Sequence, residues 1–229
     1  MIKQVSTFLS FSFSLVLAVA WGQSTETRNL SPFSHLKVSQ GIDVYLKKGD
    51  KESARVVVTG ADASKVLTEV TDKTLRVHMS SGSFRNINAK VYVTYVSLSR
   101  IFASSAGSVF AEGPIKSSRM TISTSSAGSV ELSIESEDVV LEASSAGEIT
   151  VEGTTHRLEV DASSAGDIDA YGLEASIVLV DVSSAGSAKV TATKELDADA
   201  SSGGDVRYRG NPGKLNTNSS SGGSVKKSN

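Results

Sequence analysis

The chain has 229 residues, no cysteine and a formal net charge of −2, with a sequence pI near 6.0. The nearly neutral balance provides no basic face for binding nucleic acid, and the lack of cysteine excludes a disulfide framework. Because 39% of the residues are hydrophobic and only three are proline, we expect a folded chain held by hydrogen bonds and side-chain packing.

The first 22 residues have the pattern of a secretory signal peptide. Lys3 precedes an apolar run from Phe8 to Ala20, and cleavage is expected after Ala20 or Gly22. The run is shorter than the roughly 20 apolar residues that a membrane-spanning helix needs, and no later segment reaches that length. We therefore expect an exported chain, in the periplasm, at the cell surface or outside the cell, with no transmembrane segment once the signal peptide is removed.

The region before residue 104 shows irregular strand-like segments. The segment VSQGIDV at 38–44 places a polar turn with Gly41 between two apolar strands, and Gly60 and Gly82 follow further strand-like segments. We interpret these segments as degenerate coils that follow one another in chain order, with a helical interruption at 61–68.

A four-residue turn motif repeats through the rest of the chain. Ser-Ser-Ala-Gly occurs five times and Ser-Ser-Gly-Gly twice, at 104–107, 125–128, 144–147, 163–166, 183–186, 201–204 and 220–223. Apolar residues alternate before and after each motif, as in half-buried strands. One such unit cannot bury its apolar side alone, so units of about 19 residues must stack. The sequence predicts an all-β, single-domain parallel β-solenoid at 33–229, more irregular in its N-terminal third and preceded by a linker at 23–32.

The small residues of the motif have predicted structural roles. Glycine tolerates a positive φ, so we expect one at each corner of the solenoid. The alanine before it is expected to pack in a column of small residues, and the serines are expected to form hydrogen-bonded ladders. The predicted structural turn glycines are Gly41, Gly107, Gly128, Gly147, Gly166, Gly186, Gly204 and Gly223.

Acidic residues recur two positions before the serine pairs. The predicted column consists of Glu142, Asp161, Asp181 and Asp199. At a strand spacing of ~4.8 Å, neighbouring charges repel by about 0.9 kcal/mol even in bulk water. Glu148, Asp167 and Asp205 follow the turns and add further carboxylates. A solvated acidic ridge is the preferred interpretation, a calcium site is the alternative, and no other cofactor is predicted.

The chain offers few candidates for catalysis. Its three histidines, His35, His78 and His156, lie in no recognisable nucleophile or metal motif, so no catalytic residue is predicted. The alternative is a carbohydrate-active β-helix enzyme, a polysaccharide lyase or hydrolase with paired carboxylates. Such an enzyme needs an aromatic platform beside its carboxylates, whereas the only tryptophan, Trp21, lies at the signal-peptide boundary. The sequence favours binding over catalysis.

Several segments together resemble a known family. They are Phe33, GIDV at 41–44, VTG at 58–60, LRV at 75–77, VYVT at 91–94 and the recurring Ser-Ala-Gly turns. In these the chain is similar, over about 33–227, to the head GIN domain of putative auto-transporter adhesins of Bacteroidota, with Asp43 in place of the asparagine of the family's name. The resemblance implies a repetitive β fold at the cell envelope. We therefore expect a noncatalytic, adhesin-like envelope or surface module whose flat polar and acidic faces contact a glycan, a protein or its own copies.

Overall fold

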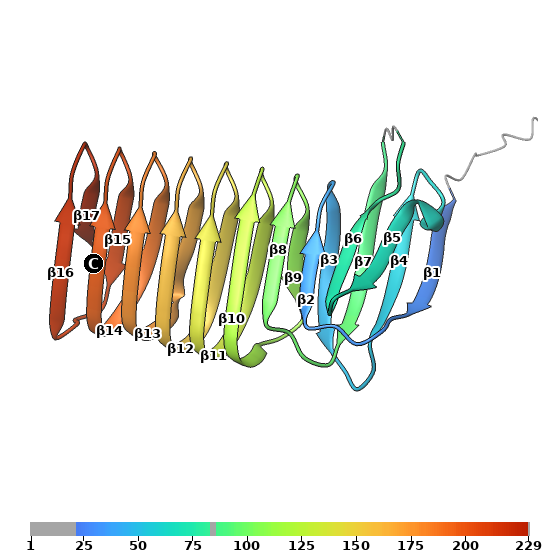
Figure 1. Ribbon diagram of the computed structural model, residues 1–229, viewed down its shortest axis with the longest axis horizontal. Coiled ribbons are helices and arrows are strands. Elements are labelled where there is room, and N and C mark those ends of the chain that lie inside the picture. The colour runs from blue at the N-terminus through green and yellow to red at the C-terminus, as the bar shows by residue number, and fades with distance from the viewer. Residues whose placement is uncertain (1–21, 83–85, 229) are drawn as a thin grey trace, which may run out of the picture.

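The computed structural model describes residues 22–82 and 86–228, which form the predicted all-β solenoid of about seven turns (Figure 1). Apart from Gly22, the predicted signal peptide lies outside the described residues. Within the described ranges, no helix has the length and hydrophobicity needed to cross a membrane. The described strands join into one 17-stranded sheet that winds around a common core.

The regular part of the solenoid runs from residue 115 to residue 227. Its strands are β10 (Ile115–Ser125), β11 (Ser129–Ala143), β12 (Glu148–Ala162), β13 (Asp167–Val182), β14 (Ser187–Ala200), β15 (Asp205–Arg209), β16 (Lys214–Ser219) and β17 (Ser224–Lys227). Each long strand contributes to two walls, because the first half of β14 pairs with β15 and its second half with β16. The Ser-Ser-Ala-Gly and Ser-Ser-Gly-Gly turns join the walls along one edge (Figure 1).

The core lies between these walls and consists of aligned aliphatic columns. We call the wall that contains β10 and the second halves of β11 to β14 the first wall. There, strand pairing stacks four buried residues: Ile122, Leu141, Val160 and Val180. Burying each such side chain contributes about 1.5–3 kcal/mol. The alternation of apolar and polar residues thus fixes which side of each strand faces inward and leaves the outer sides free for other chemistry.

The early coils lie out of chain order. Their strands are β2 (His35–Val38), β3 (Ile42–Lys48), β6 (Thr74–Met79), β7 (Asn88–Tyr95), β8 (Arg100–Ser104) and β9 (Ser108–Ala111). Strands β2 and β3 pair in parallel with β6 and β7 on one side and with β8 and β9 on the other. The coil of β6 and β7 therefore lies outside that of β2 and β3, which corrects the predicted chain order.

Antiparallel strands close the N-terminal end. They are β1 (Gln23–Asn29), β4 (Ser53–Thr59) and β5 (Val66–Thr71), and the helical interruption is a short 3-10 turn, η1 (Ala63–Lys65). Strand β1 pairs with β4, β4 with β7, and β5 with β6. The segment 23–32, predicted as a linker, thus contains a paired strand. Gly60 follows an antiparallel strand and occupies no solenoid turn, contrary to prediction.

The turns are confirmed, but of the predicted turn glycines only Gly41 has the expected positive φ (67°). In the turn 163–166 the positive φ angles belong to Ser164 (50°) and Ala165 (61°), as in a type I′ turn, and not to Gly166. A Cβ on Gly166 would overlap the carbonyl oxygen of Ala143 in the preceding coil. Glycine is therefore required by the close approach of two backbones. The alanine at each Ser-Ser-Ala-Gly turn is exposed, so the predicted packed column of alanines is also wrong.

A backbone ladder holds successive turns together. The N–H of Ala146 donates to the carbonyl of Ser164 (3.2 Å), and the series continues along the stack to Gly203 and Ser221. The serines thus contribute their carbonyl groups to the ladder, where side-chain ladders had been predicted. Gly41 begins the series by donating to Ser105 (3.0 Å), and with a φ of 67° it takes the position that alanine holds downstream.

Candidate binding surfaces

The outer surface of the first wall carries the predicted acidic column. This wall contains β6, β2, β8, β10, the second halves of β11 to β14, and β16. Strand pairing aligns Glu142, Asp161, Asp181 and Asp199. Burial and the charges of Asp181 and Glu142 raise the pKa of Asp161, as expected for crowded carboxylates. The stacking of the column is therefore confirmed, and its members repel one another.

The remaining carboxylates near the turns lie elsewhere. Glu148, Asp167 and Asp205 belong to the second wall, which contains β7, β3, β9, the first halves of β11 to β14, β15 and β17. Their side chains alternate with buried residues of this wall and therefore point to the outer surface opposite the acidic column. Although burial opposes the effect, hydrogen bonds from Arg207 and Ser224 lower the pKa of Asp205. The two acidic sets cannot share one cation. Among the described residues, no three His, Asp or Glu side chains are arranged to hold a metal ion, and calcium binding stays a prediction.

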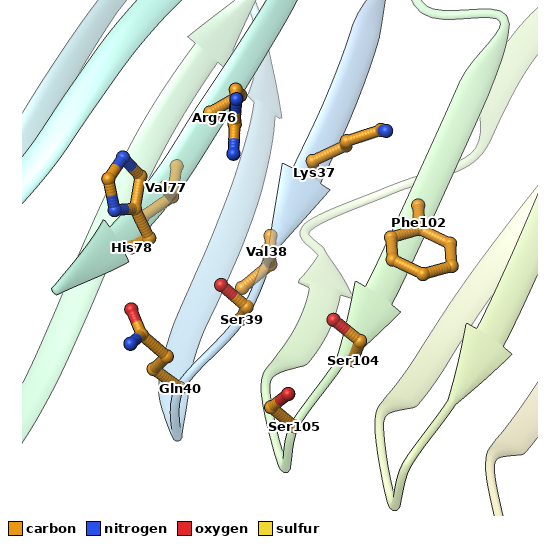
Figure 2. A pocket seen from close by; sticks show the side chains of 10 residues that line it. All are labelled: Lys37, Val38, Ser39, Gln40, Arg76, Val77, His78, Phe102, Ser104 and Ser105. Atoms are coloured by element: carbon orange, nitrogen blue, oxygen red, sulfur yellow. The ribbon is translucent and has the colours of Figure 1, made fainter. Parts of the chain in front are cut away.

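The same outer surface is basic at its N-terminal end. The row that contains the acidic column continues through Phe102 and Lys37 to Arg76. Figure 2 shows these side chains on successive strands around a groove of about 470 Å³ that His78 also lines. The Lys37 ammonium lies 5.6 Å from the centre of the Phe102 ring. We call this whole outer surface the charged face, because its two ends carry opposite charges.

Other groups at the basic end agree with this polarity. Arg100 is exposed in the neighbouring outward row, beside His35 in the strand register. Burial, together with the positive charges of Arg100 and Lys73, lowers the pKa of His35. The three histidines lie on separate strands: His35 on β2, His78 on β6, where it contacts the Met79 carbonyl (3.0 Å), and His156 on β12.

The second wall carries a feature that the sequence interpretation missed. Tyr92, Tyr45 and Phe110 project outward from β7, β3 and β9 and form an aromatic row, with ring centres 5.2 and 5.3 Å apart and planes inclined by 20° and 22°. The Arg55 guanidinium lies 4.1 Å from the centre of the Tyr92 ring, and the Lys90 ammonium 5.9 Å from that of Tyr45. The three rings are half-buried. We call this part of the second wall the aromatic face.

The row was hidden by the order of the chain. The dipeptides Val44-Tyr45, Val91-Tyr92 and Val109-Phe110 each place a ring after a buried valine, and this shared pattern was the available signal. Chain order separates these dipeptides, whereas the out-of-order stacking makes them neighbours. The aromatic platform that seemed absent is therefore built from tyrosine and phenylalanine.

A groove of about 570 Å³ begins beside the row. Glu131, which pairs with Phe110 across the strands, lines it together with Glu112, Glu152 and Asp169. Two of these carboxylates are paired with lysines, Glu112 with Lys47 at 3.3 Å and Asp169 with Lys189 at 2.9 Å. The aromatic row thus leads into a polar groove that contains hydrogen-bond donors and acceptors.

Comparison with known proteins identifies relatives of the same architecture. Residues 32–212 match the family described as "Putative auto-transporter adhesin, head GIN domain". No curated protein matches the chain. A solved structure of a putative adhesin from Bacteroides fragilis has a TM-score of 0.80 and 19% identity, and the match covers 90% of this chain and 97% of that one.

Two further structures share the fold. A putative adhesin from Parabacteroides merdae has a TM-score of 0.72 and 20% identity, with coverage of 90% and 96%. A putative lipid binding protein from Parabacteroides distasonis has a TM-score of 0.65 and 23% identity, with coverage of 90% and 97%. At these identities the likeness shows a common fold and does not assign a ligand.

Proposed function

Because the chain belongs to the head GIN domain family of putative auto-transporter adhesins, we propose that it is an exported, noncatalytic binding module whose aromatic face binds an oligosaccharide. The observation that carries the proposal is the row of Tyr92, Tyr45 and Phe110 on a flat, rigid wall. Binding sites commonly combine aromatic surface with a few placed polar groups, and both are present here.

The row suits the chemistry of a sugar. Parallel rings whose centres are more than 5 Å apart are displaced sideways, because ring carbons in direct contact would be separated by about 3.5–4 Å. Tyr45 is flanked by a ring on each side and Arg55 covers Tyr92, so a sugar would contact the ring edges and the parts of the faces that the sideways displacement leaves uncovered. The electron-rich faces can pack against the C–H groups of a pyranose, since the face of an aromatic ring carries partial negative charge.

The polar surroundings suit the hydroxyl groups of the same ligand. Lys90 and Arg55 lie beside the rings, and Glu131 extends the row into the adjoining groove. The rings are held by strand pairing on both sides, so binding would order few additional groups. A ligand that spans the row would contact more than one ring, which favours an oligosaccharide over a single sugar.

The groove beside the aromatic row also bears on the enzymatic alternative, because several carboxylates line it. Glu131 and Glu152 lie on adjacent strands, and Glu131 pairs with Thr150 while Glu152 pairs with Ser133. Both carboxylates therefore project from one wall. A glycoside hydrolase places its two carboxylates on either side of the scissile bond, so this arrangement favours binding over hydrolysis.

A glycan array on the chain from residue 23 onward tests the proposal, followed by calorimetry on the strongest ligand. The double variant Tyr45→Ala with Phe110→Ala should weaken binding at least tenfold, because truncated aromatic anchors commonly cost more than ~1.4 kcal/mol. Phe102→Ala, which removes a ring from the opposite wall, is the matched control and should bind like the wild type.

Three results would overturn the proposal. The first is that no glycan binds, and the second is that binding survives the loss of both rings while circular dichroism shows an intact fold. The third is the release of new reducing ends or unsaturated sugars from a bound glycan, which would make the protein an enzyme.

A further inference from the structure

The charged face has two halves of opposite sign in the same rows. From β6 onward, the row nearest the turns contains Arg76, Lys37, Phe102, Ser123, Glu142, Asp161, Asp181 and Asp199, and Glu69 of β5 adjoins Arg76 at the N-terminal end of the row. The neighbouring outward row repeats the pattern, with Arg100 at one end and Glu159 and Asp197 at the other. Uncharged Ser123 and Thr121 separate the halves on β10.

Arg76 lies beside Glu69 of β5 in the strand register, but among the described residues no salt bridge involves Arg76, Lys37, Arg100 or any member of the acidic column. By contrast, the charges further from the turns on the same wall are paired across strands, as in Arg119 with Asp138 at 3.3 Å. On this wall, charges far from the turns are therefore paired across strands, whereas the described charges of the two rows near the turns, from β6 onward, form no ion pair.

We infer that the charged face binds a second copy of this chain, face to face, about a two-fold axis parallel to the strands. Such a rotation reverses the order of the strands and keeps each row opposite the same row of the partner. The basic half of each copy then covers the acidic half of the other, and both contacts are equivalent, as in an isologous dimer. Without that reversal, like charges would face one another.

The dimensions of the face fit this partner. Nine strands, from β6 to β16, lie side by side in the first wall. With ~4.8 Å between strands and about five residues of ~3.3 Å per strand, the face covers roughly 650 Å². Two such faces would bury about 1,300 Å² in total, which lies within the range of specific interfaces.

The middle of the face provides apolar contact as well. Phe102, Val140 and Leu179 are half-buried in the two charged rows and point outward between the ends. An interface needs such contacts because charges alone contribute more to orientation and association rate than to affinity. The charges fix which way the partner lies, and the apolar side chains add burial.

Sedimentation equilibrium at low and high salt tests the inference, using the chain from residue 23 onward. The wild type should be a dimer at low salt and dissociate as salt screens the charges. Lys37→Glu with Arg76→Glu reverses the two basic residues of the row nearest the turns. Asp181→Lys with Asp199→Lys reverses the two carboxylates of the same row that would face them across the two-fold axis. Each double variant alone should dissociate at least tenfold more readily than the wild type.

A mixture of the two double variants decides the geometry. In a dimer of one variant with the other, residues 37 and 76 of each copy again face residues 181 and 199 of opposite charge, so the mixture should restore a species of twice the monomer mass. Lys48→Glu with Lys51→Glu, at the last residue of β3 and in the loop after it, changes the charge by the same amount as Lys37→Glu with Arg76→Glu but away from this face, and should leave the dimer intact. Circular dichroism on every variant establishes that it is folded.

Either of two outcomes would overturn the inference: a wild type that stays monomeric at low salt across the accessible concentrations, or a mixture of folded variants that stays monomeric. Glycan binding resides on the opposite wall, so its presence or absence is measured independently.

Discussion

The coils from β10 to β17 and the region from β1 to β9 build the same two walls by different means. In the regular coils, matching backbone groups meet at every level, as in the hydrogen bond from Ala165 N–H to the Ser184 carbonyl (3.2 Å). In the N-terminal region, side chains make part of the connections. Arg28 of β1 donates to the carbonyl groups of Val66 (2.6 Å) and Ala63 (3.0 Å), which joins the outermost strand to η1 and β5.

The difference shows where a repetitive fold acquires distinct surfaces. A strict repeat presents similar residues at every level, as the acidic column does. The out-of-order coils interrupt this uniformity and bring Tyr45 of β3 between Tyr92 and Phe110. They also place the basic groups Arg76 and Lys37 on the wall that is acidic further along. The regular coils extend the walls, and the irregular coils diversify them.

The largest expected effect breaks the regular region at a turn. Gly166→Val should cost about 3 kcal/mol or more, or prevent folding, because its side chain would overlap the Ala143 carbonyl and neither backbone can move without disturbing the stack. Urea denaturation measures the loss. Unfolding of Gly166→Val at the wild-type urea midpoint would refute the close packing of the turns.

Gly107 sharpens the comparison, because it lies at the boundary between the two regions. A Cβ there would lie 3.1 Å from Ser39 Cα, which a small shift can relieve, whereas alanine at Gly166 would still overlap the Ala143 carbonyl. Gly107→Ala should therefore be less destabilising than Gly166→Ala. The opposite order would mean that the boundary is packed more tightly than the regular coils.

A middle-sized effect is expected in the N-terminal region. Arg28→Ala should cost about 2 kcal/mol, because it leaves the carbonyl groups of Val66 and Ala63 without their charged donor. Arg119→Ala in the regular region is the matched control, and losing its exposed pair with Asp138 should cost less than about 0.5 kcal/mol. Equal effects on urea unfolding would mean that β1 is held by strand pairing alone.

The regular region could be predicted from sequence because its information is local. The recurring motif fixed the coil length, and alternation fixed the inward side of each strand, so the stacking of Asp161 on Asp181 followed directly. The turn conformation did not follow. Positive φ was assigned to Gly166 on its conformational freedom, whereas the structure places it on Ser164 and Ala165, since stacking leaves no room for a Cβ at residue 166.

The strand order of the N-terminal region could not be predicted, because it depends on pairing between segments that lie far apart in the chain. Nothing near β3 in the chain indicates that β7 rather than β4 continues its wall, since that choice depends on pairing between remote segments. The pairing of 23–29 with β4 was invisible for the same reason. The aromatic row depends on this arrangement. Its three rings are evident in the sequence, but their proximity is not, and the candidate site was therefore missed.

The smallest expected effect tests whether the carboxylates of the acidic column only repel one another or have a bound partner. The pKa of Asp161 is raised above its ordinary value of 3.8, so the folded protein holds this proton more tightly than the unfolded chain does. The resulting stabilisation is complete below pH 3.8 and is lost as the pH rises through the raised pKa. At neutral pH and at protein concentrations low enough to keep the chain monomeric, Asp161→Asn should therefore increase the stability by up to about 1 kcal/mol in low salt, and by less where salt screens the charges. The gain should shrink as the pH falls towards 3.8.

Asp138→Asn, which removes the partner of Arg119, is the control and should bring no gain at neutral pH. Urea unfolding of both variants across pH and salt measures these differences. A loss of stability in Asp161→Asn at neutral pH and low salt would mean that the carboxylate has a bound cation or another partner, because a carboxylate that meets only repulsion stabilises the protein when its charge is removed.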